Sequence, residues 1–71
     1  MDRLKVESSN IKSIGFDKQS RTVEVEFKTK TVYVYSNVPE EFYNNLMLSG
    51  SKGAYFSKYI KNNFKYQKLS V

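Results

Sequence analysis

The chain has 71 residues, so it is long enough for one domain with a thin core and too short for two. It has no cysteine and no histidine, which excludes disulfides, leaves no plausible zinc site and removes the commonest catalytic base and the best nucleophile. The whole net charge of +5 comes from Phe42 onward, where five lysines occur without an acidic residue, and a field of one sign attracts polyanions.

Residues 1–10 are polar and predict a loop or a weak edge segment. Met1 is followed by Asp2, Arg3 and Lys5, without the apolar stretch of a signal peptide. No later run approaches the roughly 20 apolar residues of a membrane span. We therefore expect a cytoplasmic protein without a membrane partner.

Two segments in which apolar and polar residues alternate predict the first two strands. In residues 11–17, Ile14 and Phe16 point to one side, and Ser13 and Gly15 point to the other. In residues 22–27 the alternation is the clearest in the chain, with three apolar side chains opposite three polar ones: Val23, Val25 and Phe27, against Thr22, Glu24 and Glu26. A polar break of hairpin length separates the two segments.

The run Val32-Tyr33-Val34-Tyr35 is β-branched and aromatic throughout, and it predicts a third strand that forms an antiparallel hairpin with residues 22–27. A two-residue turn at Thr29-Lys30 would place the two tyrosines beside the glutamates. A three-residue turn at Lys28–Lys30 would place them on the apolar face, because a slip of one residue moves every side chain to the other face. The alternation alone leaves both registers open.

After Asn37 the period becomes helical. Pro39 suits the first position of a helix, and Glu40 and Glu41 favour the positive end of its dipole. Apolar residues then repeat four apart, in the pairs Phe42/Leu46 and Tyr43/Met47. Ser49-Gly50-Ser51 ends this helix and offers Ser51 as the N-cap of another.

A second helix is predicted by Phe56, Ile60 and Phe64, which repeat four residues apart on one face. Four lysines fall in another arc, next to Phe64 and away from Phe56 and the flanking Tyr55 and Tyr59: Lys58, Lys61, Lys65 and Lys68. If Asn62-Asn63 ends the helix, only Lys58 and Lys61 remain on that arc. Residues 65–71 receive no assignment.

The order of elements predicts an α+β fold: a three-stranded antiparallel β-meander followed by two C-terminal helices packed on one face (β-β-β-α-α). Consecutive strands joined by short turns form the meander, and amphipathic helices must cover one of its faces. We expect a single domain over residues 1–71.

Short motifs in a fixed order resemble those of the KTSC domain over about residues 6–66. They are Ser9-Asn10-Ile11, Ile14-Gly15-Phe16-Asp17, Val23-Glu24-Val25-Glu26-Phe27, Tyr33-Val34-Tyr35, Val38-Pro39, Ser51-Lys52-Gly53 and Tyr55-Phe56. KTSC domains are short bacterial modules that occur alone or at the C-terminus of some lysyl-tRNA synthetases. The resemblance implies RNA binding, because the domain occurs within enzymes that act on a tRNA.

The resemblance also bears on the register of the hairpin. The family usually has glycine where this chain has Lys30, and glycine in that position suits a three-residue turn with a bulge. The resemblance therefore favours Tyr33 and Tyr35 on the apolar face. Lys30 itself prefers a turn in which φ is negative.

Catalysis finds little support in the sequence. Glu24 and Glu26 form a pair of carboxylates on one strand face, but alternating strands usually carry such residues toward solvent, paired with lysines of a neighbouring strand. No nucleotide-binding loop or metal-ligand spacing is present. We expect no enzyme, no cofactor and no metal.

Binding finds more support. Tyr33 and Tyr35 could stack on unpaired bases, although a chain this short favours their use as core residues. Ser51-Lys52-Gly53 at a helix start could hold a phosphate or simply cap the helix. The candidate phosphate contacts are Lys52, Lys58, Lys61 and Lys65.

We therefore expect a module that binds RNA or another nucleic acid with low sequence specificity. The alternative is a module for protein interaction or self-association, because a thin core and six tyrosines also suit an interface.

Overall fold

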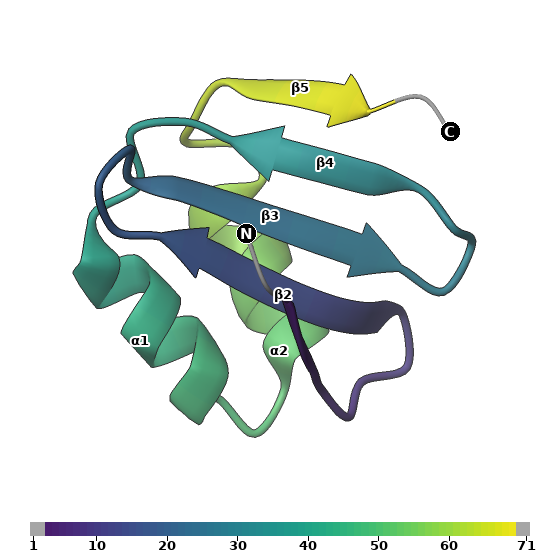
Figure 1. The fold of residues 1–71 in the computed structure, drawn as a ribbon. Helices are drawn as coiled ribbons and strands as arrows, with labels where there is room; N and C mark the ends of the chain where they lie inside the picture. Colours follow the sequence, from purple (N-terminus) through teal and green to yellow (C-terminus); the bar gives the residue numbers. More distant parts are fainter. Residues whose placement is uncertain (1–2, 70–71) are drawn as a thin grey trace.

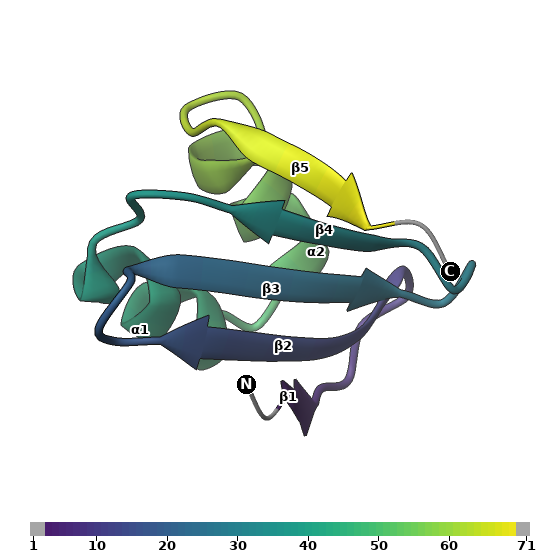
Figure 2. The same ribbon diagram turned by 45° about the horizontal axis from the view of Figure 1, so that its top comes forward.

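The sheet of this domain has five antiparallel strands in the order of the chain, and both helical segments lie on one of its faces (Figures 1 and 2). The computed structural model describes residues 3–69. The strands are β1 (Arg3–Lys5), β2 (Ile11–Asp17), β3 (Thr22–Phe27), β4 (Val32–Tyr35) and β5 (Tyr66–Leu69). Between β4 and β5 come α1 (Glu40–Leu48), α2 (Lys52–Tyr55) and η1 (Phe56–Ile60).

The α+β class, the antiparallel meander of the three central strands and the packing of both helical segments on one face are confirmed, but the sheet has five strands rather than three and the helices are not C-terminal. The chain returns to the sheet after the helices, and β5 pairs with β4. At the other edge, the polar first segment forms the short strand β1, paired with β2. All residues of both edge strands are exposed, so neither strand shows a clear alternation of apolar and polar residues, the pattern by which a strand is predicted. Residues 1–2 and 70–71 of the first segment and the tail lie outside the described residues.

The hairpin of β3 and β4 has the three-residue turn. The amide of Phe27 donates to the carbonyl of Thr31 at 2.9 Å, and that of Lys30 donates to the carbonyl of Phe27 at 2.9 Å. Val25 therefore pairs with Tyr33, and Val23 pairs with Tyr35, on one face of the sheet. The expectation that Lys30 keeps a negative φ is wrong, because φ is 71°. The bulged turn needs a left-handed residue, which costs a non-glycine residue about 1–2 kcal/mol.

The core lies between the sheet and the helices. Its buried residues alternate along the strands and recur on the inner side of the helices: Ile11, Ile14, Val23, Val25, Tyr35, Val38, Leu46, Phe56 and Ile60. In α1, Pro39 is the N-cap residue rather than the first helical residue, while Glu40 and Glu41 occupy the first turn as expected. Tyr43 of α1 stacks on Phe16 of β2, with ring centroids 4.9 Å apart.

The second helix changes its hydrogen bonding in mid-course. The short α-helical α2 continues without a break into the π-helical η1, in which the amide of Lys61 donates to the carbonyl of Phe56 at 2.9 Å. The helix stops before Asn62-Asn63, as one of the two sequence interpretations predicted. The side-chain amide of Asn63 then donates to the carbonyl of Tyr59 at 2.8 Å. Phe64 leaves the helix and packs edge-on against Phe42 of α1.

Candidate functional site

The two glutamates of β3 lie on the sheet face opposite the helices, and neighbouring strands hold both. Arg3 of β1 pairs with Glu24 across Gly15 of β2, where the absence of a side chain lets the two meet. The hydroxyl of Ser13 donates to Glu26 at 2.9 Å. Their partners are thus an arginine and a serine, not the lysines expected from the sequence.

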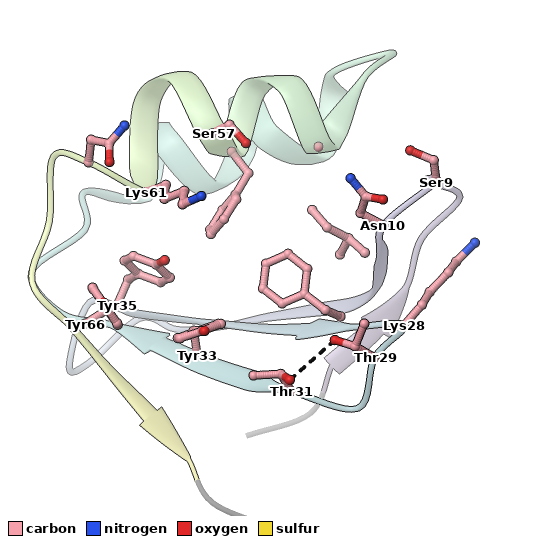
Figure 3. Close-up of a pocket in the computed structure, with 15 residues that line it drawn as sticks. Ser9, Asn10, Lys28, Thr29, Thr31, Tyr33, Tyr35, Ser57, Lys61 and Tyr66 are labelled. Atoms are coloured by element: carbon pink, nitrogen blue, oxygen red, sulfur yellow. Dashed lines mark hydrogen bonds between the residues drawn. The ribbon is translucent and has the colours of Figure 1, made fainter.

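On the helix side, a cavity of about 580 Å³ opens between α2–η1 and the strands β3, β4 and β5 (Figure 3). Its floor comes from the ends of β3 and β4 and the start of β5, and its wall comes from the helix. We call it the aromatic groove after its five rings, which are those of Phe27, Tyr33, Tyr35, Phe56 and Tyr66.

The five rings form a closed circuit in which each contacts two neighbours. Starting at Phe27, the successive centroid distances to Tyr33, Tyr66, Tyr35, Phe56 and back are 5.7, 5.4, 5.4, 5.2 and 5.6 Å. Such edge-on and tilted pairs are favourable beyond simple burial. Tyr35 and Phe56 are buried, Phe27 and Tyr33 are half-buried, and Tyr66 is 58% exposed. The circuit is therefore core on one side and accessible aromatic surface on the other.

The circuit carries three tyrosine hydroxyls. Among residues 3–69, no side chain or backbone group is hydrogen-bonded to the hydroxyl of Tyr33, Tyr35 or Tyr66, and no polar side-chain atom is both buried and unpaired. The Tyr35 ring is buried, but Tyr35 lines the groove and its hydroxyl is not among the buried unpaired atoms, so the hydroxyl reaches the groove. Burial and, to a lesser extent, electrostatic repulsion from the neighbouring Tyr66 and Tyr33 together raise the pKa of Tyr35 to about 12.

Lys61 lines the groove together with Phe56. In an α-helix of about 100° per residue, a residue five positions after Phe56 would lie about 140° around the axis from it. In η1 the five-residue hydrogen bond sets Lys61 above Phe56 instead, and both line the groove. The expectation that Lys61 points away from Phe56 is therefore wrong.

The remaining predicted lysines lie outside the groove. Lys52 is half-buried, and its ammonium donates to the carbonyl of Ser49 at 3.0 Å, at the end of α1. Lys58 is exposed, with its ammonium 5.3 Å from the ring centroid of Tyr59. Lys65 is exposed just before β5, and its carbonyl accepts from the amide of Ser36 at 2.9 Å. Ser51 is the N-cap of α2, but its side chain makes no capping hydrogen bond.

Lys28 and Tyr66 line the groove but were not predicted as site residues from the sequence. Lys28 lies at the end opposite Lys61 (Figure 3) and was seen only as part of a turn. Tyr66 was left in the unassigned tail. Its alternation with Gln67 was the only available signal, and a strand of four residues is too short for such a signal to stand out.

The charges of the domain are segregated around the groove. Among the residues that the structure describes, no carboxylate lines it, while Lys28 and Lys61 do. Glu24 and Glu26 lie on the far face of the sheet. Glu40 lies at the opposite end, where it is 4.0 Å from Lys18. A concave site whose only charged side chains are cationic concentrates positive potential.

The described helices are all too short or too polar to cross a membrane. The features of the described chain define a small α+β domain with a five-stranded antiparallel sheet, helices on one face and a basic aromatic groove between the two layers. The chain belongs to the KTSC domain family, whose sequence model matches residues 7–64. The resemblance seen in the motifs is thereby confirmed.

Known relatives fall into two kinds. Lysine–tRNA ligases from Nostoc punctiforme and Trichormus variabilis are 39% and 42% identical over 67 residues, which are 94% of this chain but 12% of each ligase. An uncharacterized protein from Stutzerimonas stutzeri is 31% identical and matches over 97% of this chain and 99% of its own length. The crystal structure of a KTSC domain protein from Yersinia pestis superimposes with a TM-score of 0.94 at 39% identity, covering 97% of both chains.

Proposed function

We propose that this KTSC domain is a non-catalytic module that binds RNA with little sequence specificity. The observation that carries the proposal is the aromatic groove, where accessible rings lie beside lysines and no described lining residue is acidic. Aromatic rings stack on unpaired bases of any identity, and lysines neutralise phosphates, so this combination is typical of proteins that bind single strands.

The composition of the groove favours binding over catalysis. Its described lining has no carboxylate, imidazole or thiol. The most enclosed hydroxyl belongs to Tyr35, whose pKa is raised by burial to about 12, and such a group stays protonated at neutral pH. It can donate or accept a hydrogen bond, but it is a poor general base there.

The relatives add support from another direction. The chain is similar to a segment that makes up 12% of each of two proteins named lysine–tRNA ligase. That name refers to an RNA. A small basic module beside an RNA-dependent enzyme could raise the affinity for RNA without chemistry of its own, because phosphate contacts are independent of sequence.

The test is the binding of fluorescent single-stranded RNA and of duplex RNA, followed by anisotropy as salt is raised. We expect binding at about 50 mM salt that weakens steadily toward about 200 mM, because counterions are released from each contacted phosphate. Single strands should bind more tightly than duplexes, since only unpaired bases can reach the rings. The absence of binding at the lowest salt would rule out the proposal.

A second candidate function, self-association, is favoured by one observation: β1 and β5 are both exposed edge strands with free backbone groups. Lysines on such edges, here Lys5 and Lys68, oppose pairing between copies. Sedimentation at micromolar concentration tests this candidate, and a strict monomer would remove it.

A further inference from the structure

The dimensions of the aromatic groove point to a ligand of one nucleotide rather than a longer stretch of strand. Its volume of about 580 Å³ falls within the range of small-molecule sites. The helix closes it on one side, and the strands form its floor (Figure 3). A recess of this kind can enclose one planar ring, while the chain on either side of that ring remains outside.

The accessible rings form a corner suited to a flat base. Tyr66 and half-buried Tyr33 lie 5.4 Å apart with an angle of 75° between their planes. A planar ring that stacks on one of them meets the edge of the other, and aromatic groups favour both arrangements. Because Tyr66 is 58% exposed, its ring has surface available for such stacking.

The polar groups of the groove suit a base edge without selecting one base. The hydroxyls of Tyr33, Tyr35 and Tyr66 can each donate or accept a hydrogen bond. The side-chain amides of Asn10 and Asn62, which also line the groove, offer both donors and acceptors. Adaptable groups of this kind bind any of the four bases, in keeping with low specificity.

The two lysines provide for phosphates on both sides of the base. Lys61 extends from the helix at one end of the groove, and Lys28 lies at the other end (Figure 3). An internal nucleotide of a strand has a phosphate on each side, whereas a free nucleoside monophosphate has one. An RNA strand could therefore place phosphates at both Lys28 and Lys61, whereas a free nucleotide could place its phosphate at only one of them.

From these observations we infer that the aromatic groove is a single-nucleotide site, with the base in the corner of Tyr33 and Tyr66 and a phosphate at Lys61. The inference deepens the proposed function and rests on it for the source of the nucleotide, an unpaired position of RNA. The π-helical turn contributes to the site, because its hydrogen bond sets Lys61 above Phe56, a member of the aromatic circuit.

The first experiment compares small probes by NMR titration at low salt: adenosine monophosphate, adenosine and inorganic phosphate. We expect adenosine monophosphate to bind at least about fivefold more tightly than inorganic phosphate, since stacking on one ring is worth a factor of roughly 5 or more. It should also bind more tightly than adenosine, which has no phosphate to contact Lys61. Shifts should concentrate at Tyr33, Tyr66 and Lys61. Equal affinity of adenosine monophosphate and inorganic phosphate would overturn the inference.

The second experiment uses variants with a matched control on the same helix. Lys61→Ala and Lys58→Ala remove the same charge from exposed positions three residues apart, but only Lys61 lines the groove. We expect Lys61→Ala to weaken the binding of adenosine monophosphate severalfold and Lys58→Ala to leave it nearly unchanged. Tyr66→Ala should weaken it similarly, while Tyr66→Phe, which keeps the ring, should retain most of the affinity. Equal losses for Lys61→Ala and Lys58→Ala would contradict the inference.

A third comparison separates this inference from the proposed function. Oligoadenylate is compared with an oligomer of the same length and charge that lacks the bases. If both bind equally, and Lys61→Ala behaves as Lys58→Ala does, RNA binding stands and the single-nucleotide site is wrong. If adenosine monophosphate binds in the groove but oligoadenylate does not, the site stands and the RNA function is wrong. Two results together support both the RNA function and the single-nucleotide site. The oligomer without bases should bind more weakly than oligoadenylate, and Lys28→Ala should weaken the binding of oligoadenylate but not that of adenosine monophosphate.

Discussion

At the scale of single residues, Tyr35 shows why a side chain can serve the core and a site together. Its ring is 3% exposed and packs edge-on against Phe56 at 5.2 Å. Its hydroxyl nevertheless opens into the groove, because the strand places the ring tip at the boundary of the core. From the sequence, packing and ligand contact are alternative roles for Tyr35, whereas an amphipathic ring of this length allows both.

This position has a consequence for ionisation. The pKa of Tyr35 is raised to about 12, from 10 in an unperturbed tyrosine. Above pH 10 the unfolded chain loses the Tyr35 proton while the folded domain keeps it, so this group lowers the free energy of unfolding as pH rises from 10 to about 12. Below pH 10 it has no such effect.

We expect Tyr35→Phe to remove a step near pH 12 from the tyrosinate absorbance titration and to flatten the loss of stability above pH 10. Tyr59→Phe is the matched control, since Tyr59 is on the surface and outside the groove. A titration in which Tyr35→Phe and Tyr59→Phe remove the same step would contradict this assignment.

At the scale of elements, the β3–β4 hairpin determines which residues line the groove, because its register brings Tyr33 and Tyr35 to the face of the sheet that the helices cover. The three-residue turn requires a left-handed residue, and Lys30 adopts φ of 71° there. A lysine in this conformation is strained, and glycine is not. The hairpin therefore forms in spite of its turn residue, held by the pairing of its strands.

We expect Lys30→Gly to raise the free energy of unfolding by up to about 1 kcal/mol, since relief of strain exceeds the added freedom of the unfolded chain. The matched control is Thr29→Gly, which changes the neighbouring residue of the same turn. Thr29 is not among the non-glycine residues with positive φ, so glycine should destabilise there. Denaturant unfolding measures both, and a destabilising Lys30→Gly would refute the role given to the turn.

At the scale of the whole molecule, one thin core supports both the fold and the groove. A domain of 71 residues has a total stability of about 4–10 kcal/mol. The residues that line the groove on one side belong to the core on the other, so a cavity in the core should disturb both.

We expect Leu46→Ala to cost about 2–5 kcal/mol, because Leu46 is fully buried, and thus to leave a marginal fold. Leu48→Ala is the control in the same helix, where the side chain is 84% exposed and the change should cost less than about 0.5 kcal/mol. Thermal unfolding followed by circular dichroism tests the pair. Similar melting temperatures for the two variants would contradict the placement of α1 over the sheet.

The sequence alone determined those parts of the protein that depend on neighbours along the chain. Strands β2, β3 and β4 and the start of α1 follow from local alternation, helical spacing and the carboxylates of Glu40 and Glu41. The absence of cysteine and histidine, and the motifs shared with KTSC domains, could also be read without a structure.

Only the tertiary structure decided what lies next to what. The tail becomes β5 because its backbone pairs with β4, and four exposed residues contain too little pattern to reveal that partner. The α-helical period misplaced Lys61, because one π-helical turn rotates everything after Phe56 relative to the helix before it. Both events shape the groove, since long-range pairing places Tyr66 in its lining and the π-helical turn sets Lys61 above Phe56.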